Sequence, residues 1–181
     1  MAAPTPKRRT SATAKEHHGH GVQYAALPFR RRKPSKAASG RKDGLQILLV
    51  TSRDTGRWVI PKGWPMKGKR PHAAAAREAL EEAGVTGKIG KLPLGAYRYQ
   101  KRLKNGAALT CLVDVFPLQV QRQRKDWPER RQRTAHWFTP LDAAKAVDEP
   151  ELAALIEAFA EWGAAAQPGL VVEPPGETGE A

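Results

Sequence analysis

The 181-residue sequence has little of what marks a secreted or membrane protein. Its single cysteine, Cys111, excludes a disulfide within the chain, so we predict a reducing, cytoplasmic setting. No apolar run approaches the ~18 residues of a membrane-spanning helix, which predicts a protein without a membrane partner. The polar N-terminal stretch also lacks the apolar segment of a secretory signal.

Acidic residues are scarce relative to basic ones. The chain has 18 Asp and Glu against 31 Lys and Arg, which gives a formal net charge of +13. Such a field attracts polyanions, and the candidates are nucleic acids, anionic lipid surfaces and small molecules rich in phosphate. Charge alone does not choose among these partners.

Large apolar side chains are almost absent from both ends of the chain. Residues 1–20 are polar and basic, and residues 165–181 are rich in Pro, Gly and Glu. Segments with so little apolar surface cannot build a core, so we predict a disordered arm and a disordered tail. The remaining residues, 21–164, have the length of about one domain.

Between these ends the sequence alternates between strand-like and helix-like patterns, which predicts an α/β domain. The clearest strand is Leu45–Thr51, a short apolar run with β-branched members, and Asn105-Gly106 is a typical hairpin turn. We expect a loop at Arg30–Lys33 and a very basic loop at 121–134. Further strands are expected at 22–29, 57–60, about 88–102, about 107–120 and 135–138, and helices at 72–83, 141–147 and 149–165.

The 72–83 helix carries three carboxylates on one face. Glu78, Glu81 and Glu82 are at positions i, i+3 and i+4, which are neighbours on a helix surface. Their mutual repulsion is relieved by water or by a cation, and dense hard oxygen ligands suit Mg²⁺ or Mn²⁺. We expect small apolar residues on the opposite face to pack on a sheet and hold all three carboxylates outward. These residues are Ala73, Ala76, Leu80 and Ala83.

A plain solvated acidic face is the alternative interpretation of this helix, and two features count against it. Arg77 lies four residues before Glu81 and can orient it through a charge-assisted hydrogen bond. The cluster is also the only acidic one in the expected folded part of a basic chain. Cations flank it at Lys62, Lys67, Lys69 and Arg70. Cations around a carboxylate–metal centre suit a substrate with several phosphates.

The segment Gly63–Val85 resembles the Nudix box, whose pattern is G-x5-E-x7-R-E-U-x-E-E-x-G-U with U an aliphatic residue. Its R-E-x-x-E-E core stands at residues 77–82 and is followed by the closing Gly84-Val85. Lys69 is the one departure, because it stands where the pattern has its first Glu. The resemblance implies an α/β/α sandwich around a mixed β-sheet, with a loop–helix–loop at the box.

In the Nudix family the glutamates of this stretch bind divalent cations, and a carboxylate activates the water that attacks a diphosphate. By that resemblance Glu78 and Glu82 become metal ligands, and Glu81 becomes an additional ligand or the general base. Arg77 becomes the residue that orients a carboxylate. We therefore expect Arg77, Glu78 and Glu81 to be catalytic, with Mg²⁺ or Mn²⁺ as the cofactor.

Residues outside the box resemble the diphosphoinositol polyphosphate and diadenosine polyphosphate branch of the family. The landmarks are Leu48–Ser52, Arg57–Gly63, Asp126–Glu129, His136–Phe138 and Asp142–Ala144. The resemblance implies a highly anionic small-molecule substrate, which the basic charge of the chain also favours. The candidate substrate-binding residues are Lys62, Gly63, Arg53, Arg57, Lys67, Lys69 and Arg98.

Two other functions are open at this point. The same site would serve an RNA 5′-pyrophosphohydrolase, whose basic arm and loop would bind the RNA backbone. Alternatively, Lys69 would mark a Nudix-fold nucleotide- or nucleic-acid-binding protein without activity. The intact Glu78, Glu81 and Glu82 argue against the second alternative.

Overall fold

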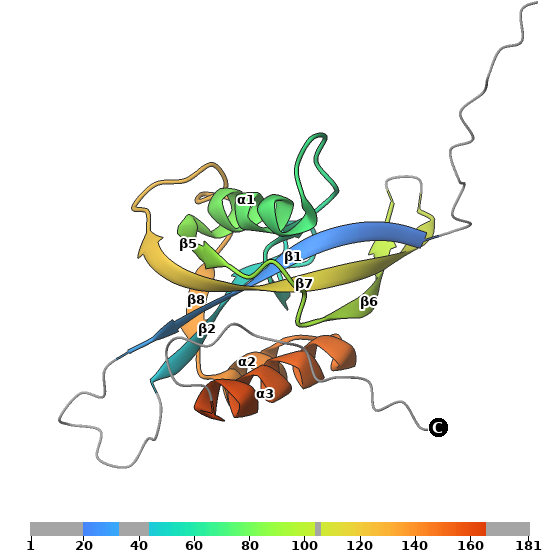
Figure 1. Ribbon diagram of the computed structural model, residues 1–181. Helices are drawn as coiled ribbons and strands as arrows, with labels where there is room; N and C mark the ends of the chain where they lie inside the picture. The colour runs from blue at the N-terminus through green and yellow to red at the C-terminus, as the bar shows by residue number, and fades with distance from the viewer. Residues whose placement is uncertain (1–19, 33–43, 104–105, 166–181) are drawn as a thin grey trace, which may run out of the picture.

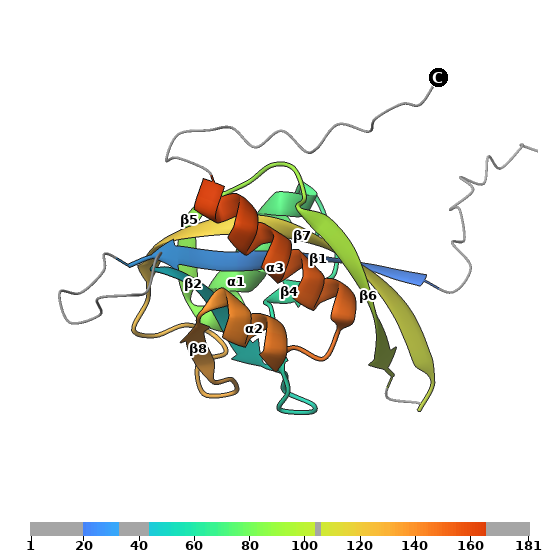
Figure 2. The ribbon, with the colours of Figure 1, turned by 90° about the horizontal axis from the view of Figure 1, so that it is seen from below.

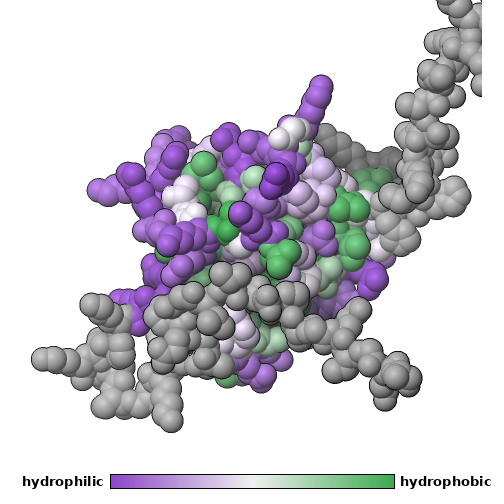
Figure 3. Space-filling model, in the orientation of Figure 1, coloured by the Kyte–Doolittle hydropathy of each residue, from purple (hydrophilic) through white to green (hydrophobic). Residues whose placement is uncertain are grey.

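The computed structural model describes residues 20–32, 44–103 and 106–165. The predicted arm and tail lie outside these residues apart from His20 and Ala165, so the predicted disorder stays a prediction. Among the described residues, no helix is both long enough and apolar enough to span a membrane. On the face seen in Figure 3, hydrophilic residues dominate and the apolar patches are small and separate.

Two long parallel strands form the centre of a mixed sheet. β1 (His20–Arg31) pairs with β7 (Ala108–Gln123) in a parallel register that runs from His20 opposite Thr110 to Phe29 opposite Gln119. The other strands join in antiparallel ladders: two pair with β1, two pair with β7, and two pair with the strand of residues 45–51, which itself pairs with β1. They are β2 (Leu45–Thr51), β3 (Trp58–Val59), β4 (Lys62–Gly63), β5 (Val85–Ile89), β6 (Gly95–Arg102) and β8 (Ala135–Phe138).

Helices cover both faces of this sheet, as the family resemblance implied. α1 (Pro71–Ala83) lies on one face, and α2 (Pro140–Ala146) and α3 (Pro150–Ala165) lie on the other (Figure 1). Seen from below, α3 crosses the sheet over β1 and β7 (Figure 2). The arrangement confirms an α/β/α sandwich, which buries the apolar faces of the sheet on both sides.

The helix expected at 72–83 begins one residue earlier, at Pro71, and ends at Ala83 as predicted. Pro71 stands in its first turn, and Gly84 follows its last residue with a left-handed φ of 70°. The buried face, however, differs from the prediction. The helix packs on the sheet with Ala74, Ala75, Ala79 and Ala83, together with Glu82. The expectation that all three carboxylates point outward is therefore wrong for Glu82, whose residue is only 6% exposed.

The predicted loops at the two basic runs are partly strand. Arg30 and Arg31 belong to β1, because they pair with Gln46 and Leu45 of β2. The guanidinium of Arg30 also lies 4.0 Å from the ring centre of Trp137. At the second run, β7 continues to Gln123 because Val85 and Thr86 of β5 pair with it there. Tertiary pairing thus overrides the loop-like composition of both runs.

Two further predictions about elements needed adjustment, and a third is tested only in part. The strand expected at about 88–102 is two strands, β5 and β6, because each pairs with a different part of β7. In α3, helical spacing predicts that Leu152, Leu155, Ile156, Phe159 and Trp162 are core residues. Leu152, Ile156 and Phe159 are buried and Leu155 is partly buried, whereas Trp162 is 37% exposed. Asn105 of the predicted turn lies outside the described residues, and Gly106 has the positive φ that the turn requires.

Candidate active site

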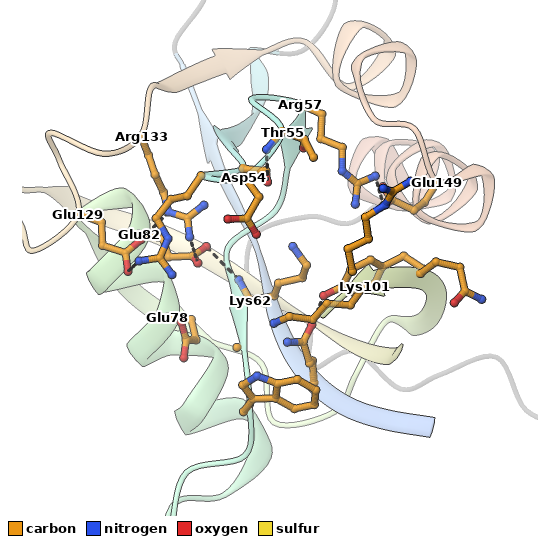
Figure 4. Close-up of a pocket in the computed structure, with 18 of the residues that line it drawn as sticks. Asp54, Thr55, Arg57, Lys62, Glu78, Glu82, Lys101, Glu129, Arg133 and Glu149 are labelled. Atoms are coloured by element: carbon orange, nitrogen blue, oxygen red, sulfur yellow. Dashed lines mark hydrogen bonds and ion pairs between the residues drawn. The ribbon is translucent and has the colours of Figure 1, made fainter. Parts of the chain in front are cut away.

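A cleft of about 840 Å³ opens beside the N-terminal loop of the box and the exposed side of α1. Figure 4 shows its two walls. Glu78, Glu82, Glu129 and Arg133 lie together on one wall, and Lys62, Lys101, Arg57 and Glu149 lie across from them. The volume is within the roughly 300–1,000 Å³ of small-molecule sites. The cleft therefore has room for a substrate between a carboxylate wall and a wall with cations.

Gly63 brings Glu78 close to the sheet. This glycine belongs to β4, which pairs with Tyr24 and Ala25 of β1. A Cβ placed at Gly63 would overlap the Glu78 carboxylate, so only a glycine lets the carboxylate approach the backbone. Burial, with repulsion from Glu81 and Glu129, raises the pKa of Glu78. The structure thus gives a physical reason for the first glycine of the box.

Glu82 is the most buried of the three box carboxylates. Its Oε1 accepts a hydrogen bond of 2.5 Å from Nη2 of Arg133, and its Oε2 accepts one of 3.2 Å from the backbone N–H of Lys62. Burial raises the pKa of Glu82 to about 7, against the opposite pull of the Arg133 and Lys62 charges. Burial thus opposes the ionised form of this carboxyl, and any further cation in the cleft would favour it.

Arg133 is a cleft residue that the sequence analysis did not single out. Its side chain is 7% exposed, and its Nε donates a 2.5 Å hydrogen bond to Glu129 while Nη1 donates one of 2.9 Å to the Thr51 carbonyl. It thereby joins Glu82 of α1 to Glu129 of the basic loop. The spacing of Glu129 and Arg133, four residues apart, was the available signal. Five other basic residues in the same run, from Arg122 to Arg131, hid it.

The loop that carries Glu129 and Arg133 is tied to the end of α1. The backbone N–H of Glu129 donates to the Glu81 carbonyl at 3.1 Å, and the Trp127 indole N–H donates to the Glu82 carbonyl at 3.2 Å. A Cβ on Gly84 would lie 2.5 Å from the Trp127 ring. The glycine that ends the helix therefore also seats the loop, so that Glu129 faces the cleft.

Arg77 and Glu81 interact as predicted. Nε of Arg77 lies 2.5 Å from Oε1 of Glu81, in an ion pair that is partly exposed to solvent. This contact restricts the Glu81 carboxylate, which lines the cleft beside Glu78. The geometry is compatible with the orienting role that the family resemblance assigned to Arg77.

Lys62 extends from β4 into the opposite wall. Burial lowers the pKa of its ammonium group, and Nζ lies 5.2 Å from the ring centre of Tyr99. Tyr99 in turn donates a 2.6 Å hydrogen bond from its hydroxyl to Gln23 of β1. Arg57 lies on the same wall but forms a 2.6 Å ion pair with Glu149 and a 3.7 Å pair with Asp148. The charge of Arg57 is therefore already compensated by its neighbours.

The cleft contains four of the seven expected substrate-binding residues, Lys62, Gly63, Arg53 and Arg57. The other three are not part of its lining, and their role in substrate binding stays a prediction. Lys67 and Lys69 lie in an exposed turn that Gly68 permits with a φ of 74°. Arg98 lies on the outward face of β6, where it pairs with Glu151 at 3.3 Å.

The high positive charge of the chain is not concentrated in this cleft. Its lining contains six basic and seven acidic side chains. The lining is therefore close to neutral in formal charge rather than strongly basic. The reason lies in the fold, because several sequence neighbours of the box, such as Lys67 and Lys69, point into solvent.

The donors of the carboxylate wall fit a divalent cation. Four glutamates, at 78, 81, 82 and 129, line it, and hard oxygen ligands of this kind suit Mg²⁺ or Mn²⁺. Within the described residues, no three metal-ligating side chains are already arranged as a metal site. Arg133 and Arg77 explain this, since each guanidinium binds a glutamate oxygen. Glu78 makes no hydrogen bond or ion pair with the described residues, so its oxygens are available.

Fold and site together define a class of protein, an α/β sandwich with a glutamate-rich helix facing a substrate cleft. Comparison with known families gives the assignment. The model of the NUDIX domain matches residues 37–159, which is more than half of the chain, so this protein belongs to the Nudix family and is a Nudix hydrolase.

Individual relatives agree with this assignment. The chain is 35% identical over 102 residues to Nudix hydrolase 12, mitochondrial, of Arabidopsis thaliana, a match of 55% of this chain and 50% of that relative. It is 32% identical to the mouse diphosphoinositol polyphosphate phosphohydrolase 3-alpha, over 67% of this chain and 71% of that one. The structure of a C. elegans Ap4A hydrolase in a binary complex superposes with a TM-score of 0.56 and 21% identity. That superposition covers 80% of this chain and 98% of the other, and it supports the fold.

Proposed function

We propose that this Nudix hydrolase cleaves a phosphoanhydride bond in a diadenosine polyphosphate or diphosphoinositol polyphosphate type of substrate, with Mg²⁺ or Mn²⁺ as cofactor. The observation that carries the proposal is the pair of walls in one cleft. Four glutamates face Lys62 and Lys101 across a space of ligand size. The two relatives whose names refer to diphosphoinositol polyphosphates and to Ap4A support the substrate class.

Each residue of the carboxylate wall has a part in the proposed reaction. Glu78 and Glu82 would hold the cation, because both extend from α1 toward β4 and their oxygens lie at the cleft. When bound, the cation polarises a phosphoryl oxygen and makes the attacking water more acidic. Glu81, oriented by its 2.5 Å contact with Arg77, accepts the proton of that water. Arg133 positions Glu82 and Glu129 relative to each other.

Water is the only co-reactant that the proposed hydrolysis needs. The water oxygen forms a new bond to phosphorus, and the bond from phosphorus to the bridging oxygen breaks. The bridging oxygen leaves with the electron pair and receives a proton in solution or from Glu81. Lys62, which is buried beside Tyr99, binds a non-bridging phosphate oxygen of the substrate as charge builds up there.

A substrate panel with a matched pair of variants tests this proposal. We expect wild-type protein with Mg²⁺ or Mn²⁺ to hydrolyse diadenosine polyphosphate or a diphosphoinositol polyphosphate, measured as phosphate or nucleotide release. Glu82→Gln is expected to lower kcat by at least about 100-fold, because it removes a charged ligand of the cation, whose stabilisation of the transition state is worth several kcal/mol. Glu157→Gln, an exposed change on α3, is the control and should retain wild-type kcat.

Three results would contradict the proposal. They are equal rates for Glu82→Gln and wild type, a strong preference for ADP-ribose or a simple nucleoside triphosphate, and hydrolysis of 5′-triphosphate RNA alone. The last result would favour the RNA 5′-pyrophosphohydrolase. The cytoplasmic setting also stays a prediction, which fractionation of cells that express the protein would test, and one relative is named as mitochondrial.

A further inference from the structure

Trp64 is an exposed aromatic residue at the cleft that neither the box nor the proposed reaction uses. It follows Gly63 directly, lines the cleft together with Pro65 and Met66, and is 41% exposed. A tryptophan buries a large apolar surface when it packs in a core, whereas the exposed part of Trp64 lies at the cleft. Of the described tryptophans, only Trp64 is both exposed and part of the cleft lining.

Residues of two different strands lie close to the indole ring of Trp64. A Cβ on Gly21 of β1 would lie 2.8 Å from two ring carbons, so the ring rests against the backbone of that strand. Nζ of Lys101, on β6, lies 4.9 Å from the ring centre. The close approach to Gly21 restricts the ring, so less side-chain freedom is lost when a ligand binds to it.

A flat apolar ring beside an ammonium group is suited to a ligand that joins an aromatic ring to phosphate. The face of an indole carries the negative end of its quadrupole, so it attracts cations and stacks with aromatic rings but does not attract phosphates. Nucleobases stack on aromatic side chains in this way. Lys101 is placed to bind the phosphate next to such a base.

The charge of the cleft favours the same type of ligand. The lining has seven acidic and six basic residues, and Arg57 is already paired with Glu149 and Asp148. Few cations are therefore free to bind an inositol pyrophosphate, whose ring carries phosphate at every position. A nucleoside polyphosphate instead concentrates its charge in one short chain, beside uncharged ends. The phosphate chain of such a ligand suits the metal-binding carboxylate wall, and its uncharged base suits the ring of Trp64.

We propose that Trp64 stacks on the nucleobase of the substrate and Lys101 binds the adjacent phosphate, so that this site selects nucleoside polyphosphates over inositol pyrophosphates. This inference rests on the proposed function and narrows its substrate class. Trp64 is a specificity-determining residue in this view, and its contribution is to substrate binding.

Kinetics of Trp64→Leu on two substrates test the inference. We expect the ratio of kcat/KM for diadenosine tetraphosphate to kcat/KM for a diphosphoinositol polyphosphate to fall about tenfold, equivalent to about 1.4 kcal/mol. The change should lie in KM for the nucleotide, because stacking is made equally before and during the reaction. Trp64→Phe should restore most of the ratio, and Trp162→Leu, at an exposed tryptophan on α3, should leave it at the wild-type value.

The inference is overturned if Trp64→Leu lowers kcat/KM equally for both substrates, which is the expected result for a purely structural role or for misfolding. If wild type hydrolyses neither substrate, the proposed function fails, and calorimetric binding of ADP and of inorganic diphosphate decides the inference separately. A preference for ADP that Trp64→Leu reduces about tenfold supports it. No preference in wild type, or an unchanged preference in the variant, contradicts it.

Discussion

The two faces of the sheet are packed in different ways. Toward α2 and α3 the core contains large side chains, among them Leu27, Ile47, Tyr97, Ile156 and Phe159. Toward α1 the contacts from the helix are made by Ala75, Ala79 and Ala83 against valines and other strand residues. Bulky side chains remove more apolar area from water, so the α2 and α3 side contributes more of the stability per residue.

The alanine-rich side has a different purpose. Small residues let α1 approach the sheet closely, and this brings Glu78 against Gly63 of β4 and Glu82 against the backbone N–H of Lys62. The same side accepts a buried carboxylate with a raised pKa. The comparison shows one face that mainly stabilises the domain and one whose packing sets the positions of the proposed catalytic groups.

Substitutions that change side-chain volume on each face should show the largest difference between the two faces in stability and kcat. Ile156→Ala should lower the free energy of unfolding by roughly 2–5 kcal/mol, because it leaves a cavity in the large core. The folded fraction should keep its kcat. Ala79→Leu should cost roughly 1–3 kcal/mol by overpacking and also reduce kcat, since it displaces the helix that carries Glu78 and Glu82.

Chemical denaturation and kcat per folded molecule, measured on both variants, check this prediction. The distinction between the two faces is wrong if Ile156→Ala reduces kcat per folded molecule as much as Ala79→Leu does.

Gly84, at the end of α1, allows a test of how much its contact with Trp127 contributes to stability. Gly84→Ala should destabilise the protein by about 3 kcal/mol, because alanine disfavours its φ of 70° and the new Cβ would displace Trp127. Gly56→Ala is the matched control, with the same φ of 70° but no atom within 4 Å of the added Cβ, and should cost about 1 kcal/mol. Thermal unfolding of both variants measures the difference, and equal losses would show that contact with Trp127 contributes nothing.

The smallest expected effect is the pH dependence of metal binding by Glu82, the carboxylate buried on the α1 side. A cation that binds Glu82 must displace its proton when the pH lies below a pKa of about 7. Affinity for Mn²⁺ should therefore be greatest above pH 7 and fall by up to about tenfold per pH unit as the pH drops below it. Calorimetric titration with Mn²⁺ between pH 5.5 and 8 measures this slope. In Glu82→Gln the affinity for Mn²⁺ should change less with pH. A wild-type affinity that is independent of pH would contradict the prediction.

Local patterns in the sequence were sufficient for much of the fold and for the helix of the site. The spacing of Glu78, Glu81 and Glu82 and the ends of α1 at Pro71 and Gly84 depend on neighbours within a few residues. Such features follow from backbone geometry that any stretch of the chain carries with it. The partition of the basic runs between strand and loop was not predictable, because it depends on pairing with distant strands.

The sequence by itself determined the Nudix box, the α/β character and the carboxylates that face a common direction along one helix. Only the tertiary structure decided that Glu82 is buried, that Arg133 comes from 51 residues away to bind it, and that Trp64 rather than Lys67 or Lys69 lies at the cleft. The physical reason is that burial and charge compensation depend on which residues meet in space. Spacing along the chain specifies a helix face, but not the partner that covers it.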